Sequence, residues 1–199
     1  TPNNFPEGDV MKRTVLYVTS NELKFQVARH IFEKTGLSDS IELEQASQVS
    51  LSEIQAESSV DVALRKASDA YRVCGVSCIV SDSSFHIPAL NGFPGPFVKF
   101  VNRWLTAKQI LLMLEQDQRV EAFYDDVRVY VNAKGESYAF HCTTHGHVDP
   151  AVRDASGRGV DSIFIPDGFD VPLSSLQADD LLSVWDESGW WKLKAHLGV

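Results

Sequence analysis

Asp82 is the residue of this 199-residue chain whose setting most favours chemistry. It follows an apolar run, Cys78 to Val80, and precedes Ser83 and Ser84, and the rigid segment Pro94 to Pro96 comes soon after. We expect a strand to end before Asp82 and a turn of small residues to follow. A carboxylate at a rigid strand end beside small residues can hold a metal or a water. An ordinary strand and turn with one solvated Asp fits the same residues.

A second polar group lies between an apolar run and a helical pattern near the start of the chain. Thr19, Asn21 and Lys24 would form a turn at a helix N-terminus, where unpaired N–H groups favour an anion and Lys24 could neutralise it. The alternative is a helix capped by Ser20 or Asn21, with Lys24 in solvent.

Glu53 and Glu57 are carboxylates that could act together with Asp82. Magnesium prefers oxygen ligands and keeps several waters, so two carboxylates and the phosphates of a substrate make a sufficient site. The alternative is that both glutamates are solvated, as most acidic residues are.

Composition narrows the class of protein. The chain is 44% hydrophobic with a net charge of -9, so it can bury one large core and carries no direct nucleic-acid signature. Its three cysteines form no CxxC pair, which favours thiols in a reducing, intracellular compartment. No apolar run is long enough to span a membrane. The polar start at Thr1 fits a processed organellar (mitochondrial) precursor or a trimmed cytoplasmic chain.

Hydrophobic periodicity predicts the elements that must position these residues. Strands are expected at 14–18, 41–43, 78–80, 121–131, 137–148 and 163–165. Helices are expected at 22–34, 60–73 and 97–114, with a break at Thr106 and a last, Trp-bearing helix at the end of 178–197. The order predicts an α/β domain with a mixed sheet over residues 13–199, after a flexible tail at 1–12.

Several segments in a fixed order resemble the inosine triphosphate pyrophosphatase family, the non-canonical purine NTP pyrophosphatases. VTSNELK resembles the family's TxNxxK phosphate loop, and SEIQ resembles the segment that supplies a metal-binding Glu. SDSSFHIPALNGFPGPFVKF is similar to the family's acidic pair and its following "AL.G.PGP..K" stretch. GRGVDSIFIPDGF is similar to its "FGWDP.F.P.G" signature. The likeness runs from Thr14 to Phe169.

The resemblance implies an ITPase-like fold: a long mixed β-sheet flanked by helices, in two lobes with a nucleotide cleft between them, and a homodimer. It implies hydrolysis of a nucleoside triphosphate to the monophosphate and diphosphate with Mg²⁺. It assigns substrate binding to Thr19, Asn21, Lys24 and Asp161, with Asp161 helping to read the purine base. It assigns catalysis and magnesium binding to Glu53 and Asp82.

Two departures from the family pattern bear on activity. Ser81 replaces one carboxylate of the acidic pair, and the region expected to carry Lys, Asn and a Ser-His-Arg triplet reads LQADDLLSVWDESGWW. We therefore expect an impaired enzyme, without cofactor, kept as a structural or accessory subunit of a larger assembly. The alternative is an active pyrophosphatase with altered base preference, so the sequence leaves enzymatic activity open.

Overall fold

The centre of the fold is a seven-stranded mixed sheet. The computed structural model describes residues 12–51, 54–114, 119–149 and 159–199. Along the sheet the order is β2-β1-β3-β5-β6-β7, and the two-residue β4 pairs with the far end of β3. The strands are β1 (Arg13–Tyr17), β2 (Ile41–Gln45), β3 (Cys78–His86), β4 (Pro94–Gly95), β5 (Val120–Val131), β6 (Ser137–Val148) and β7 (Phe164–Pro166). The first three pair in parallel and the others antiparallel, as the predicted mixed sheet requires.

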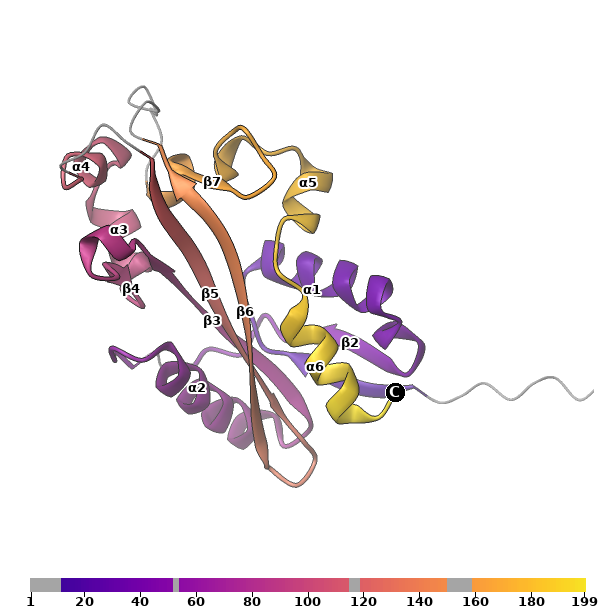
Figure 1. Cartoon of the computed structure of the whole chain (residues 1–199). Helices are drawn as coiled ribbons and strands as arrows, with labels where there is room; N and C mark the ends of the chain where they lie inside the picture. Colours follow the sequence, from indigo (N-terminus) through magenta and orange to yellow (C-terminus); the bar gives the residue numbers. More distant parts are fainter. Residues whose placement is uncertain (1–11, 52–53, 115–118, 150–158) are drawn as a thin grey trace, which may run out of the picture.

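Helices cover both faces of this sheet (Figure 1). α2 lies on one face, and α1 and α6 lie on the other. α3 and α4 lie near the far end of β3, with Thr106 capping α4 at the predicted break. The helices are α1 (Glu22–Thr35), α2 (Ser59–Cys74), α3 (Val98–Trp104), α4 (Ala107–Leu111), α5 (Ala178–Ser183) and α6 (Ser188–Leu197).

The two long helices begin and end at capping residues. The side chain of Asn21 accepts the backbone N–H of Lys24, and the side chain of Ser58 accepts that of Asp61. Gly36 and Gly75 end α1 and α2 in the left-handed conformation that glycine adopts without strain. The cap at Asn21 was part of one alternative predicted for this turn, but Lys24 is partly buried and not in solvent as that alternative required.

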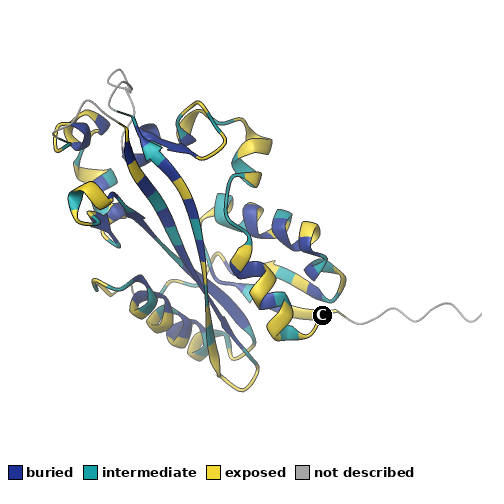
Figure 2. Ribbon diagram, in the orientation of Figure 1, coloured by how far each residue is buried: buried dark blue, intermediate teal, exposed yellow. Residues whose placement is uncertain are grey.

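Alternation along β3 and β5 assigns their side chains to the two faces of the sheet. Val80, Val127 and Val129 are fully buried in the core under α2. Ile79 and Tyr130 point to the opposite face, in the core under α1 and α6. Figure 2 shows the resulting buried band along the strands, with exposed residues on the outer sides of the helices. Both faces of the central strands are therefore covered.

The structure corrects the prediction that a strand ends before Asp82. β3 continues to His86, so Asp82 lies in the middle of a strand and pairs with Val127 of β5. The hydroxyl groups that suggested a turn are satisfied across the sheet: Ser83 donates to Asp126, and Ser84 donates to the carbonyl of Asp125. Because β5 supplies a complete ladder partner, the low strand propensity of serine does not end β3.

Gly146 on β6 permits the close approach of β7. A Cβ added there would lie 2.3 Å from the carbonyl oxygen of Ile165 and 2.6 Å from the ring of Phe164. We expect Gly146→Ala to lower the free energy of unfolding by about 1–3 kcal/mol, because the backbone of β7 must shift. Urea denaturation measures this, with His145→Ala, at the exposed neighbouring position, as the control. Equal stability of the two variants would contradict the packing argument.

No helix within the described ranges is both long and apolar enough to cross a bilayer.

Candidate active site

A cavity of about 930 Å³ opens where β3 runs on past the end of β1. On β3, β1 pairs only with Cys78 and Ile79. On the edge of β3 that faces β1, the residues after Ile79 therefore border the cavity and not another strand. A volume of this size accommodates a nucleotide. Its polar wall includes Thr19, Asn21, Lys24, Lys66, Ser81, Asp82, Ser83, Lys99, Asn102, Tyr124, Asp126, Arg128 and Asp161.

Five of the six residues predicted for the site line this one cavity. Thr19, Asn21 and Lys24 come from the turn that opens α1, Asp82 from β3, and Asp161 from the segment before β7. The sixth, Glu53, lies outside the described residues. Glu57 is exposed and is not part of the wall. The roles of the predicted residues stay predictions, but their convergence on one cavity is a feature of the fold.

The turn before α1 is held by its own side chains. Thr19 Oγ1 accepts the backbone N–H of Asn21 at 3.1 Å, and Asn21 Oδ1 accepts that of Lys24 at 3.2 Å. Lys24 is partly buried, and loss of solvent around its ammonium group lowers its pKa. Asp126 and Asp82 oppose this shift, whereas Lys66 and Arg128 add to it. Lys24 therefore lies within electrostatic reach of two carboxylates and two other cations.

Asp82 forms an ion pair with Lys66 of α2. Lys66 Nζ lies 3.1 Å from Asp82 Oδ1 and 3.3 Å from the carbonyl oxygen of Ser81, and both charged side chains are about 15% exposed (14% and 15%). The pair fixes the carboxylate at the cavity wall. Lys66 was not predicted, because its partner lies on a strand 16 residues further along the chain.

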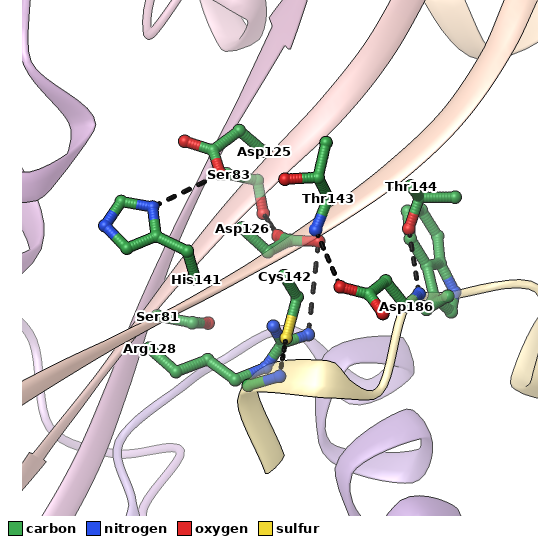
Figure 3. Close-up of polar contacts among 12 residues, drawn as sticks. Ser81, Ser83, Asp125, Asp126, Arg128, His141, Cys142, Thr143, Thr144 and Asp186 are labelled. Carbon is green, nitrogen blue, oxygen red and sulfur yellow. Dashed lines mark hydrogen bonds and ion pairs between the residues drawn. The ribbon is translucent and has the colours of Figure 1, made fainter. Parts of the chain in front are cut away.

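Asp126 and Arg128 are two further charged residues that the sequence analysis missed. Both are buried and lie on the face of β5 under α1 and α6. Asp126 accepts a hydrogen bond from Ser83, and its other oxygen lies 4.0 Å from Arg128 NH2 (Figure 3). The sequence VEAFYDDVRVYV carried a signal for them, because its alternation places Asp126 and Arg128 on one side of a strand.

Asp161 lies at the other end of the cavity. Tyr124 Oη donates a hydrogen bond to its carboxylate, and Asn102 Oδ1 accepts the backbone N–H of Val160 at 2.9 Å, which fixes the segment. Burial raises the pKa of Asp161, partly offset by the Tyr124 hydrogen bond. Trp185 packs edge-on against Tyr124, with ring centres 5.6 Å apart. This end therefore combines aromatic surface with one partly buried carboxylate.

Asp161→Asn should stabilise the unliganded protein at neutral pH. A carboxyl group whose pKa is higher in the folded than in the unfolded state loses its stabilising contribution as the pH rises through the folded pKa. The asparagine variant avoids that loss, so its advantage should be present at pH 7 and disappear in acid. Urea denaturation from pH 4 to 7 measures it, with exposed Asp167→Asn as control. A stability difference independent of pH would show that burial of the charge is not its cause.

The metal-binding capacity of the wall is limited to a few oxygen donors. Within the described ranges no three His, Cys, Asp or Glu side chains form a metal-binding group. Asp82 and Asp126 both line the cavity, but the register of β3 and β5 places their side chains on opposite faces of the sheet. Carboxylate oxygens such as those of Asp82 suit Mg²⁺ when phosphates and waters complete its coordination. Asp82 together with a phosphorylated ligand therefore provides donors that suit a magnesium ion.

The acidic residues near the C-terminus do not line the cavity. Asp186 accepts the backbone N–H of Thr143 at 2.9 Å and hydrogen bonds from Ser188, and Glu187 forms an ion pair with Lys34. These contacts hold α6 against the sheet. Asp179 and Asp180, in the exposed first turn of α5, are also absent from the wall. These acidic residues therefore add no negative charge to the described wall, which carries Lys24, Lys66, Lys99 and Arg128.

Comparisons with known proteins agree with the predicted resemblance. The sequence profile of the Ham1 family matches residues 15–181. Proteins named dITP/XTP pyrophosphatase are 31% identical over 166 residues in Methanopyrus kandleri and 33% identical over 165 residues in Thermococcus kodakarensis. These alignments cover 83% and 82% of this chain, and 86% and 85% of the relatives. The solved structure of a HAM1 protein from Coxiella burnetii superposes with a TM-score of 0.71 at 19% identity, covering 94% of this chain and 98% of that one.

Proposed function

The chain belongs to the Ham1 family, and from this premise we propose that it hydrolyses a nucleoside triphosphate to the monophosphate and diphosphate. The observation that carries the proposal is the cavity wall, which combines the cations of Lys24, Lys66 and Arg128 with the carboxylates of Asp82 and Asp126. Cations bind the phosphate chain, and carboxylates serve a metal ion and the attacking water. The names of the relatives favour a non-canonical purine base such as hypoxanthine or xanthine.

The phosphates are proposed to lie along the turn from Thr19 to Lys24, beside Lys66. The base then extends toward Asp161, Tyr124 and Trp185, where aromatic rings can pack on it and the carboxylate can accept a base N–H. A length of about 13 Å separates Tyr124 from Arg128, four residues along β5. This span suits a nucleotide that places its base at one end and its phosphates at the other.

In the proposed reaction a water oxygen forms a bond to the α-phosphorus while the bond from that phosphorus to the bridging oxygen breaks, and diphosphate leaves. Asp82 is placed to orient this water and accept its proton, because the ion pair with Lys66 holds the carboxylate at the cavity wall. When bound, Mg²⁺ supplies neutralisation of charge on the phosphate oxygens, with Asp82 and Glu53 as its proposed ligands.

The impaired, structural-subunit interpretation is less well supported than the active one. It depended on lost cations, whereas four cationic side chains line the described wall. Ser81 does lack the family's carboxylate, but its hydroxyl is engaged with Tyr17 at 2.7 Å, and Asp126 supplies a carboxylate to the same cavity. Protein partners, whether a second copy or a larger complex, stay a prediction.

A product assay tests the proposal. Purified protein is incubated with Mg²⁺ and inosine, xanthosine, adenosine or guanosine triphosphate, and diphosphate and monophosphate are quantified. We expect the two products in equal amounts, with faster turnover of the inosine and xanthosine substrates. Binding of the triphosphates without turnover would favour the impaired interpretation, and absence of both binding and turnover would contradict a nucleotide function.

A further inference from the structure

Arg128 has hydrogen-bonding capacity that the described protein does not use. Its side chain is only 8% exposed and lines the cavity. Its guanidinium carbon lies 4.8 Å from the centre of the Trp190 ring, and NH2 lies 4.0 Å from Asp126 Oδ2. Nε and NH1 are both buried, and neither has a hydrogen-bond partner among the described residues.

Such an arrangement is unfavourable unless an acceptor arrives from outside the described part of the chain. A guanidinium group stays charged at every physiological pH, and buried donors without acceptors are destabilising. The nearest carboxylate, Asp126, is beyond hydrogen-bond distance and also receives the Ser83 hydroxyl. Figure 3 shows Asp126 between Ser83 and Arg128, so its carboxylate is shared by both. The ring of Trp190 supports the guanidinium plane but accepts no hydrogen bond from Nε or NH1.

The charge around Arg128 identifies the kind of acceptor. Lys24 is close enough for Arg128 to lower its pKa, so the two cations face a common region of the cavity. A ligand group that satisfies both must be anionic. Asp161, the carboxylate at the proposed base end, accepts a hydrogen bond from Tyr124. Tyr124 lies about 13 Å from Arg128 along β5. The position of Arg128 therefore matches the phosphate end of the ligand.

We propose that Arg128 binds a phosphate group of the substrate through Nε and NH1, beside Lys24. This inference rests on the proposed function, and it adds a substrate contact to the turn at Thr19, Asn21 and Lys24. The parallel N–H groups of a guanidinium match two oxygens of one phosphate, a geometry that a lysine ammonium cannot reproduce. Asp126 and Trp190 act as positioning residues that hold the guanidinium plane.

A ligand series tests the contact. Binding of inosine, inosine monophosphate, inosine triphosphate and inorganic tripolyphosphate, each with Mg²⁺, is measured calorimetrically for the wild type, Arg128→Lys and Arg128→Met. We expect Arg128→Met to weaken triphosphate and tripolyphosphate binding by about 10- to 100-fold and to leave inosine binding unchanged. Arg128→Lys should recover only part of the loss. Arg72→Met, which removes an exposed arginine of α2, is the matched control.

Two results would overturn the inference. Equal losses for inosine and for the triphosphate would place Arg128 at the base, and unchanged tripolyphosphate binding by Arg128→Met would remove it from the phosphate site. If Arg128→Met does not fold, the rise in melting temperature on adding tripolyphosphate is compared between the wild type and Arg128→Lys, and an equal rise overturns the proposal. If tripolyphosphate binding depends on Arg128 but the protein shows no turnover, the proposed hydrolytic function is contradicted and the phosphate contact of Arg128 is not.

Discussion

Replacing Asp82 by asparagine is expected to lower kcat for nucleoside triphosphate hydrolysis by about 100- to 1,000-fold, with a much smaller change in KM. The carboxylate is proposed to orient the attacking water and to share a magnesium ion with the phosphates. Asparagine keeps the size and an acceptor for Lys66, but loses the negative charge that both roles need. Diphosphate release under saturating substrate measures the effect.

The matched control for Asp82 is Asp125→Asn on the neighbouring strand. Asp125 Oδ1 lies 3.4 Å from Nδ1 of His141, and the Asp125 side chain is not part of the cavity wall. Its replacement should therefore leave kcat within about twofold of the wild type. A second variant, Asp82→Glu, keeps the charge but displaces it, and should retain part of the activity. Full activity of Asp82→Asn would contradict the role assigned to this carboxylate.

The elements that could be predicted from the sequence are those with strong local signals. The helical spacing after Asn21, the glycine at the end of α1 and the turn from Asn132 to Gly135 between β5 and β6 all fix structure over a few residues. The break at Thr106 was equally local, because the residue caps the next helix. These elements were predicted to within a few residues.

The length of β3 could not be predicted, because it depends on a distant partner. Ser81 to Ser84 have little intrinsic preference for a strand, and only pairing with β5 keeps them extended. Their hydroxyl groups hydrogen-bond to groups on β5, α2 and β1 that lie far away in the sequence. The short apolar run alone therefore underestimated the strand.

The charged residues Asp126 and Arg128 of the cavity wall were missed for a related reason. In β5 the valines at 127, 129 and 131 suggest one buried face, so the other face, with Asp126 and Arg128, reads as solvated. In the fold α1 and α6 cover that second face, and α6 comes from the end of the chain. A pattern within one strand carries no information about a helix some 60 residues later, so the burial of Asp126 and Arg128 could not be predicted from it.

Lys24→Met is expected to raise KM for the triphosphate by about 10- to 100-fold with a smaller change in kcat. Lys24 is proposed to bind the phosphates in both the ground state and the transition state, so its loss weakens binding more than it slows the chemical step. The same substitution should stabilise the unliganded protein at neutral pH. A lysine whose pKa is lowered by burial destabilises the fold at any pH below its unfolded pKa, and Met removes that charge.

Weaker substrate binding together with a higher free energy of unfolding in the Lys24→Met variant distinguishes a ligand-binding lysine from a structural one. Lys192→Met, at an exposed position of α6, should change neither KM nor the free energy of unfolding by a measurable amount. Lys24→Arg keeps the charge and should retain part of the affinity. If Lys24→Met destabilised the protein and left KM unchanged, the lysine would serve the fold alone. The phosphates of the substrate would then have to bind at another part of the cavity.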